Sequence, residues 1–185
     1  MAQPPDLGQL IKKLGLLRRL SAKLTFHSKL IFFKSLVIPH FDYCATVLFL
    51  FNESQKKDLQ ILQNKFLRII LQLPRDSSSN AMLERLDMLN TTQLINKNVI
   101  KFLFKIETKT APEYLHPLLV KRSETCVYNV RSRNMFTLKK YKKNLTQNSL
   151  FYKGVKLYNE FKAKTIENLT LSRLNNEIIM FVKIH

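Results

Sequence analysis

Three residues in the stretch SLVIPHFDYCATVLF have side chains that could do chemistry. His40, Asp42 and Cys44 occupy alternate positions between apolar neighbours. They could ligate a metal ion, or Cys44 could act as a nucleophile with His40 as its base. They could equally be incidental polar residues of a buried helix, or part of a family signature. On a helix His40 and Cys44 share a face and Asp42 points away from it.

The rest of the chain offers few partners for a site at this stretch. The other histidines, His27, His116 and His185, form no ligand-spaced pair, and the second cysteine, Cys126, is remote from Cys44. A metal site needs a third and a fourth ligand. A cysteine nucleophile needs an oxyanion loop, and no glycine-rich segment lies nearby. Free cysteine is among the most buried residue types, so we interpret Cys44 as a core residue and predict no metal and no cofactor.

The acidic residues are equally uninformative about catalysis. The 13 Asp and Glu are dispersed, and no two aspartates are adjacent. Polymerases and nucleases instead cluster carboxylates around two metal ions. P-loop, HExxH, GxSxG and protein-kinase patterns are also absent. We therefore predict that this chain is not an enzyme by itself and has no small-molecule substrate.

Charge is the strongest feature of the composition. Lys and Arg number 31 against 13 Asp and Glu, which gives a net charge of +18. The excess is uneven, with +6 in residues 1–96 and +12 in residues 97–185. Such a field concentrates polyanions, and nucleic acid is the commonest one inside cells. RNA or DNA backbone is the predicted partner.

Residues 121–148 carry the densest positive charge and form what we call the basic connector. Between positions 121 and 143 it has 8 basic residues and a single acid, Glu124. Basic side chains alternate there with aromatic ones, which could stack on bases. The alternative is that the rings pack on the helical body and the lysines form a solvated face. The predicted nucleic-acid-binding residues are Tyr128, Arg131, Arg133, Lys139, Lys140, Tyr141, Lys142 and Lys143, with Phe136 as a further stacking candidate. A secondary patch is Lys12, Lys13, Arg18 and Arg19, equally well explained as the polar face of a helix.

Apolar periodicity predicts an all-α fold, a helical thumb-like bundle followed by the basic connector and C-terminal helices. The first helix begins after Asp6, and a second region from Thr25 to Phe51 is bent at Pro39. A third begins at Asn52 with a reciprocal cap from Gln55. Later helices are predicted from residue 80 to about 88, from 92 to 108, as a short helix from 112 to 120, and over 150–164 and 170–183. The predicted domains are 1–120, 121–148 and 149–185.

The seam of the third helix has the clearest helical spacing in the chain. Its apolar residues alternate steps of three and four, which predicts one buried stripe. The seam consists of Leu59, Leu62, Phe66, Ile69, Ile70 and Leu73.

Neither a secretory signal nor a membrane span is expected. The amino-terminal MAQPPDLGQL has no basic region before an apolar run. The most apolar stretch, residues 30–51, carries Lys34, Pro39, His40 and Asp42, each costly in a bilayer. With two scattered cysteines, a reducing intracellular location, nuclear or cytoplasmic, is predicted.

Several ordered motifs resemble the region that follows the polymerase core in non-LTR retrotransposon reverse transcriptases of the jockey and CR1-like kind. LIFFKSLVIPHFDYCATVLF is similar to the family's run around "P-h-dY", with Leu48 and Phe49 where tryptophan is usual. LQILQNKFLRII is similar to its "LQ…nk-lR-i", TKTAPEYLHPLL to its "aP-yL…l", and YNVRSR to its "ynlR". SLFYKGVKLYNEF is similar to its "fy-G-k-lWN-lP", with Tyr158 replacing tryptophan and the closing proline missing. These matches span roughly residues 10–161.

The resemblance implies a thumb-and-connector piece of an RNA-directed DNA polymerase. The family's palm, with its paired aspartates, would precede Met1, so the piece would be detached from the catalytic centre and inactive alone. Its expected role is to grip the backbone of the template and primer duplex. In this view Pro39, Asp42 and Tyr43 are architectural residues.

A second hypothesis is a helical protein-interaction module. A thumb without its palm would leave apolar surface uncovered, and large exposed apolar patches drive association. The seam of the third helix would then meet another copy of the chain or a polymerase core.

Overall fold

The computed structural model describes residues 7–125, 134–138, 149–165 and 171–184. These residues form helices and no sheet, which confirms the all-α prediction, and their one β-pairing is an isolated bridge between Lys121 and Phe136. The chain divides into two compact units, Met1–Ile95 (unit 1) and Asn96–His185 (unit 2). The predicted domain division at residues 120 and 148 stays a prediction.

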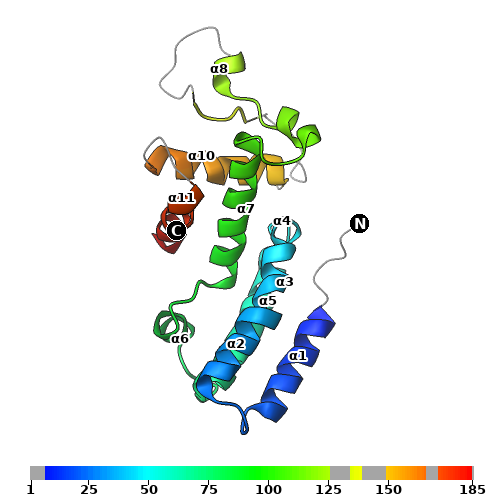
Figure 1. Cartoon of the computed structure of the whole chain (residues 1–185), viewed down its shortest axis with the longest axis vertical. Helices are drawn as coiled ribbons and strands as arrows, with labels where there is room; N and C mark the ends of the chain where they lie inside the picture. Colours follow the sequence, from blue (N-terminus) through cyan, green and yellow to red (C-terminus); the bar gives the residue numbers. More distant parts are fainter. Residues whose placement is uncertain (1–6, 126–133, 139–148, 166–170, 185) are drawn as a thin grey trace. The chain divides into compact units, whose positions relative to one another are not determined.

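Unit 1 contains six helices among its described residues. They are α1 (Leu7–Leu20), α2 (Phe26–Leu36), α3 (Ile38–Tyr43), α4 (Ala45–Leu48), α5 (Glu53–Leu71) and α6 (Ser79–Arg85). The first turns of α7 (Thr91–Glu107) also belong to it. Helices α1, α2 and α5 pack against one another, and α6 packs on α5 (Figure 1).

The core of unit 1 lies where α1, α2 and α5 meet. The buried face of α1 consists of Leu10, Leu14 and Leu17. Phe33 of α2 packs against Phe66 of α5, with their ring centroids 5.6 Å apart. Tilted aromatic pairs at this separation add to the free energy of simple apolar burial.

The predicted bent helix over residues 25–51 is three separate helices. Thr25 caps α2, because its side chain accepts a hydrogen bond from the Ser28 N–H. The first break comes at Val37, and Pro39 lies in the first turn of α3, where its missing N–H leaves no intrahelical bond unmade. A second break at Cys44 separates α3 from α4, and the sequence interpretation missed it.

A buried polar cluster joins α5 to the start of α7 inside unit 1. The Gln63 side chain is fully buried, donates to the Leu89 carbonyl at 2.9 Å and accepts from the Thr91 hydroxyl at 2.9 Å. Asn90 and Gln93 cap the helix reciprocally, at 2.8 and 3.0 Å. Each buried polar atom thereby gains a partner, which removes the cost of desolvating it.

Unit 2 is built around the second half of α7. Its other elements are the 3₁₀ helix η1 (Glu113–Leu118), α8 (Arg122–Thr125), the π-helical turn η2 (Leu150–Gly154), α10 (Val155–Lys164) and α11 (Leu171–Ile184). Aromatic rings line its core. Tyr158 contacts Phe136 and Phe161, and Phe161 packs edge-to-face with Phe181, with their ring centroids 5.4 Å apart.

Part of the basic connector is held firmly within unit 2. The Asn159 side chain clamps the backbone of Phe136, accepting from its N–H and donating to its carbonyl, each at 3.0 Å. The Arg122 N–H donates to the Met135 carbonyl, and the Thr137 N–H to the Val120 carbonyl, both at 2.9 Å. Residues 134–138 are therefore an extended segment fixed on α10.

None of the helices in the described ranges combines the length and the hydrophobicity needed to cross a bilayer.

Candidate anion-binding site

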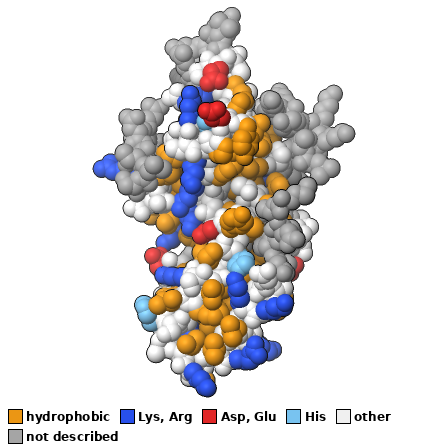
Figure 2. All heavy atoms as spheres, turned by 45° about the vertical axis from the view of Figure 1, so that its right-hand side comes forward, with side chains coloured by type: hydrophobic (Ala, Val, Ile, Leu, Met, Phe, Trp, Pro, Cys, Tyr) orange, Lys and Arg blue, Asp and Glu red, His pale blue; other side chains and the backbone are white. Residues whose placement is uncertain are grey.

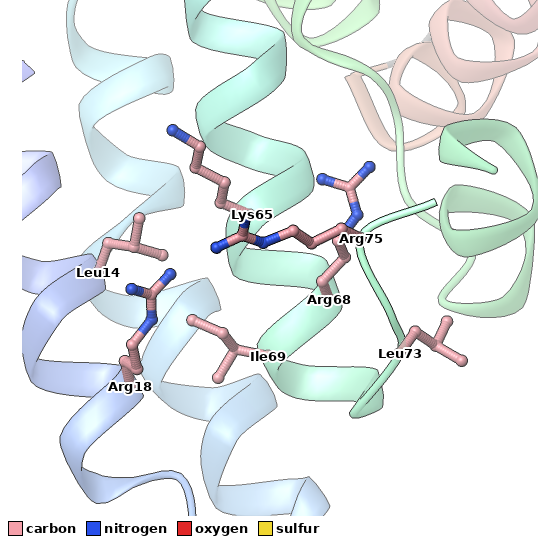
Figure 3. A pocket seen from close by; sticks show the side chains of 7 residues that line it. All are labelled: Leu14, Arg18, Lys65, Arg68, Ile69, Leu73 and Arg75. Carbon is pink, nitrogen blue, oxygen red and sulfur yellow. The ribbon is translucent and has the colours of Figure 1, made fainter. Parts of the chain in front are cut away.

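A basic cavity lies in unit 1. It has a volume of about 740 Å³ and is lined by Leu14, Arg18, Lys65, Arg68, Ile69, Leu73 and Arg75. Figure 3 shows Arg18 extending from α1 towards α5, Lys65 and Arg68 on α5, and Arg75 on the segment after it. Three stretches of sequence therefore supply one lining.

Four of the seven lining side chains are cationic and none is acidic. Within the described part of the chain, no carboxylate pairs with Arg18, Lys65 or Arg75. Cations gathered around one space repel each other, and a bound anion removes that repulsion. Leu14, Ile69 and Leu73 supply an apolar wall beside the charges.

Arg68 has the most unusual environment of the four. Its Nε is buried and has no hydrogen-bond partner among the described residues. One of its terminal nitrogens donates to the Ser77 carbonyl, at a long 3.5 Å. A buried N–H without a partner costs free energy.

The local sequence explains how α5 presents these residues. Asn52 and Gln55 form the predicted capping box at its start, with bonds of 2.8 and 3.1 Å. Lys65, Arg68 and Ile69 then share one face, because residues three and four apart are neighbours on a helix. The helix ends where Gln72 adopts a left-handed conformation with φ of 54°. Pro74 cannot continue a helix, so the chain turns and carries Arg75 to the cavity.

A second, smaller cavity in unit 1 has mixed charge. Its volume is about 230 Å³, and Glu53, Lys56 and Lys57 are among its lining residues. Glu53 and Lys56 already form an ion pair of 3.1 Å. This cavity is therefore expected to attract an anion less strongly than the cavity lined by four cations.

In unit 2, Glu107 gathers the polar side chains of several segments. It accepts from the Tyr158 hydroxyl at 2.6 Å and from the Lys162 ammonium at 2.7 Å, with Lys121 at 3.5 Å. Burial by itself raises the pKa of Glu107, but the hydrogen bonds from Lys162 and Tyr158 and the positive charge of Lys162 and Lys121 outweigh it, so the pKa is lowered. Burial, followed by the Glu107 carboxylate, raises the pKa of Tyr158. The cluster is satisfied internally, which is typical of a structural role.

The triplet His40, Asp42 and Cys44 does not form a site. His40 contacts the Lys13 ammonium, and burial together with the Lys13 charge lowers its pKa. Cys44 is buried, as the sequence interpretation predicts. Among the described residues no group of three His, Cys, Asp or Glu could hold a metal ion. Tyr43, interpreted as architectural, is 84% exposed and adds nothing to the core.

The eight predicted nucleic-acid-binding residues lie outside the described residues. They are Tyr128, Arg131, Arg133, Lys139, Lys140, Tyr141, Lys142 and Lys143.

Phe136 is described, and its predicted role in base stacking is wrong. Its side chain is 2% exposed because the clamp from Asn159 holds it against Tyr158. The seam prediction is also wrong as a partner surface, since Leu59, Leu62 and Phe66 are buried inside unit 1.

Sequence reasoning found parts of the cavity without recognising them as one site. Arg18 belongs to the predicted secondary patch, and Lys65 and Arg68 lie in a motif of the resemblance. Arg75 is a turn residue that drew no attention. The signal in the sequence that could have indicated the site is the three-residue spacing of Lys65 and Arg68, which places both cations on one side of the helix beside the buried seam.

No family model, curated protein or solved structure matches this chain.

Proposed function

We propose that this chain binds the phosphate backbone of RNA or DNA and has no catalytic activity alone, as a thumb-and-connector piece of a non-LTR retrotransposon reverse transcriptase. The observation that carries the proposal is the cavity of unit 1, where four cationic side chains meet without an acid. The net charge of +18 supports it. The motifs that resemble the retrotransposon family suggest the larger protein.

The chemistry of the cavity suits phosphate oxygens. Arg18, Arg68 and Arg75 each carry a planar fork of donors that matches a phosphate, and Lys65 adds a compact charge. Contacts of this kind position a nucleic acid and carry no base identity. Binding is therefore expected to be strong at low salt and indifferent to sequence.

The basic connector is the second proposed contact. Its arginines and lysines would add phosphate contacts, with Tyr128 and Tyr141 stacking on bases. The two surfaces make separable contributions, because they lie in different units and different variants remove each.

The test is the salt dependence of binding to single-stranded RNA with hydroxyl ends. A pocket variant, Arg18→Gln with Lys65→Gln and Arg75→Gln, removes three exposed cations from the cavity. If all three contact phosphates, the log–log slope flattens by roughly two units. A matched control, Lys12→Gln with Arg19→Gln and Lys34→Gln, removes the same charge from exposed positions of unit 1 outside the cavity lining.

Fluorescence anisotropy measures the slope, and circular dichroism verifies folding. We expect the slope to flatten less in the control variant than in the pocket variant. If the slope flattens equally in both, the cavity is only one part of a diffuse positive surface. Absence of salt-dependent binding by the unmodified chain would refute the proposed function.

A second candidate function is a helical module that associates with itself or with a polymerase core. The observation favouring it is the exposure of large apolar side chains on α1 and α2, including Ile11 at 58%, Phe26 at 51% and Ile31 at 51%. Figure 2 shows hydrophobic side chains at the surface between lysines and arginines. Self-association that persists at high salt in sedimentation experiments would favour this candidate.

A further inference from the structure

The cations of the unit 1 cavity surround one space, so they can engage a single phosphate group of a strand together. Arg18, Lys65, Arg68 and Arg75 come from three segments and line the same space. A nucleic-acid backbone presents its phosphates in a row, each with one negative charge. Four cations around one cavity suit a ligand whose charge is concentrated at a point.

A phosphate monoester is such a ligand. It carries a charge of about −1.5 to −2 near pH 7 and three strong acceptor oxygens. An internal phosphodiester has one charge and two free oxygens. The third oxygen gives the Arg68 guanidinium an acceptor beyond those that Arg18 and Arg75 would engage.

The lining also argues against a metal-bound polyphosphate. Mg²⁺ is held by oxygen ligands, usually carboxylates, together with the phosphates. None of the seven lining residues is acidic or supplies a side-chain oxygen. The positive charges of the protein must therefore neutralise the ligand directly.

The apolar part of the lining gives the remainder of the ligand a place. Leu14, Ile69 and Leu73 lie beside the cations, and the volume of about 740 Å³ is within the range of ligand pockets and far exceeds one phosphate. A terminal nucleotide, with its sugar and base against the apolar wall, accounts for both halves of the lining.

We propose that this cavity binds the phosphorylated end of a single nucleic-acid strand, recognising the terminal phosphate monoester. This proposal rests on the proposed function, because the strand is taken to be the ligand. It adds that the site distinguishes a chain end from the interior of the chain.

The experiment compares short single-stranded RNAs of one sequence that differ only in their ends. One carries a 5′-phosphate, one a 3′-phosphate, and one has hydroxyl groups at both ends, with the dye attached internally. At about pH 7.5 the monoester is close to a dianion. One additional charge-assisted hydrogen bond predicts about tenfold tighter binding of a phosphorylated strand than of the hydroxyl strand. The phosphorylated strand that binds more tightly shows which end, 5′ or 3′, the cavity recognises.

The variants locate the effect. The pocket variant is expected to abolish the preference for the phosphorylated strand, whereas the control variant, with the same loss of charge, keeps it. Arg68→Lys retains the positive charge but not the fork of donors, so it is expected to reduce the preference. The pocket variant alters exposed residues only, so the test does not depend on whether the Arg68 variant folds.

Equal affinity for all three strands would overturn the inference and leave the proposed function intact if binding is still salt-dependent. A preference that survives in the pocket variant would also overturn it, because the end would then be recognised elsewhere. If none of the strands binds, the proposed function fails and the inference with it.

Discussion

Glu107 holds together three parts of unit 2 through one carboxylate. Tyr158 and Lys162 come from α10, Lys121 precedes α8, and Lys162 also donates to the Asn134 carbonyl at 3.0 Å. The Tyr158 hydroxyl donates to Glu107 at 2.6 Å. The side chain of Tyr158 is otherwise buried among aromatic rings.

Replacing the carboxylate tests this role. Glu107→Gln keeps the shape of the side chain but leaves Lys162 and Lys121 without their counter-charge. The expected loss in the free energy of unfolding is about 1–3 kcal/mol, the range for a hydrogen bond to a charged group. Urea denaturation measures it. Glu113→Gln, at an exposed site of unit 2, is the control, and an equal effect there would contradict the prediction.

His40 predicts a dependence of stability on pH. Its pKa is lowered in the folded state, chiefly by burial and also by Lys13. Below about pH 6.5, the ordinary value for histidine, the unfolded chain binds more protons at this position, so the stability falls as the pH falls towards the folded pKa. We expect His40→Gln to flatten this part of the stability profile.

Unfolding in urea at a series of pH values measures this effect. His27→Gln is the matched control, because His27 is exposed. Profiles of equal steepness for the unmodified chain and His40→Gln would show that another group titrates. Glu107, whose pKa is lowered from 4.5, contributes a separate loss of stability in the more acidic range below pH 4.5.

At the scale of elements, α5 contributes both to the core of unit 1 and to the cavity. Leu59, Leu62 and Phe66 are buried in the core, and Lys65 and Arg68 line the cavity. The two sets lie on adjacent sides of the helix, because Ile69 of the seam also lines the cavity and residues three and four apart are neighbours. The apolar packing of the seam therefore sets the position of the cations beside it.

The contact between α7 and η2 depends on the absence of a side chain at Gly154. A Cβ there would lie 3.1 Å from Leu150 Cδ1 and 3.3 Å from Val99 Cγ1, whereas a Cβ at Gly15 in α1 meets nothing within 4 Å. Alanine in a helix is favoured over glycine by about 1 kcal/mol. Gly15→Ala is therefore expected to raise the free energy of unfolding, and Gly154→Ala to raise it less or lower it.

Thermal unfolding followed by circular dichroism compares the two variants. An equal rise in the free energy of unfolding for both variants would show that unit 2 has room for the additional methyl group at Gly154.

The basic connector predicts a change in salt dependence. Lys139, Lys140, Lys142 and Lys143 lack the apolar periodicity of a core element, so changing all four to Gln is expected to leave folding intact. On single-stranded RNA the log–log slope is expected to flatten by roughly three units if all four contact phosphates. Anisotropy titrations measure the slope, and the affinity for RNAs of different sequence should fall equally. An unchanged slope in a folded variant would leave the cavity of unit 1 as the binding surface.

At the scale of the whole molecule, the chain combines two helical units with a large positive charge and dispersed acids. Two-metal catalysis requires carboxylates held close together. The described residues contain no group of acidic, histidine or cysteine side chains able to hold a metal ion.

The purified chain is accordingly expected to lack polymerase, nuclease and hydrolase activity. Primer extension on an RNA template with Mg²⁺ or Mn²⁺ should not exceed that of a heat-inactivated sample. Extension above that level, lost on changing an acidic residue, would contradict the prediction.

The sequence by itself determined the helical class and most of the helices. The capping box of Asn52 and the buried seam of α5 are local features, and each is set by residues at helical spacing within one stretch. The break at Val37 lies two residues before the bend predicted at Pro39, whereas the break at Cys44 escaped prediction because the apolar pattern continues across it. The Cys44 break depends on packing that a local window does not contain.

The tertiary structure alone decided which distant residues meet. Phe136 looks like a surface aromatic among basic residues until Asn159, 23 positions later, clamps its backbone. Arg18 and Arg75 are separated by most of unit 1, yet they line one cavity because α1 packs on α5. The spacing of residues encodes the faces of each helix, but the contacts between helices arise from burial of apolar surface, which is not directional and leaves little trace in any short stretch of sequence.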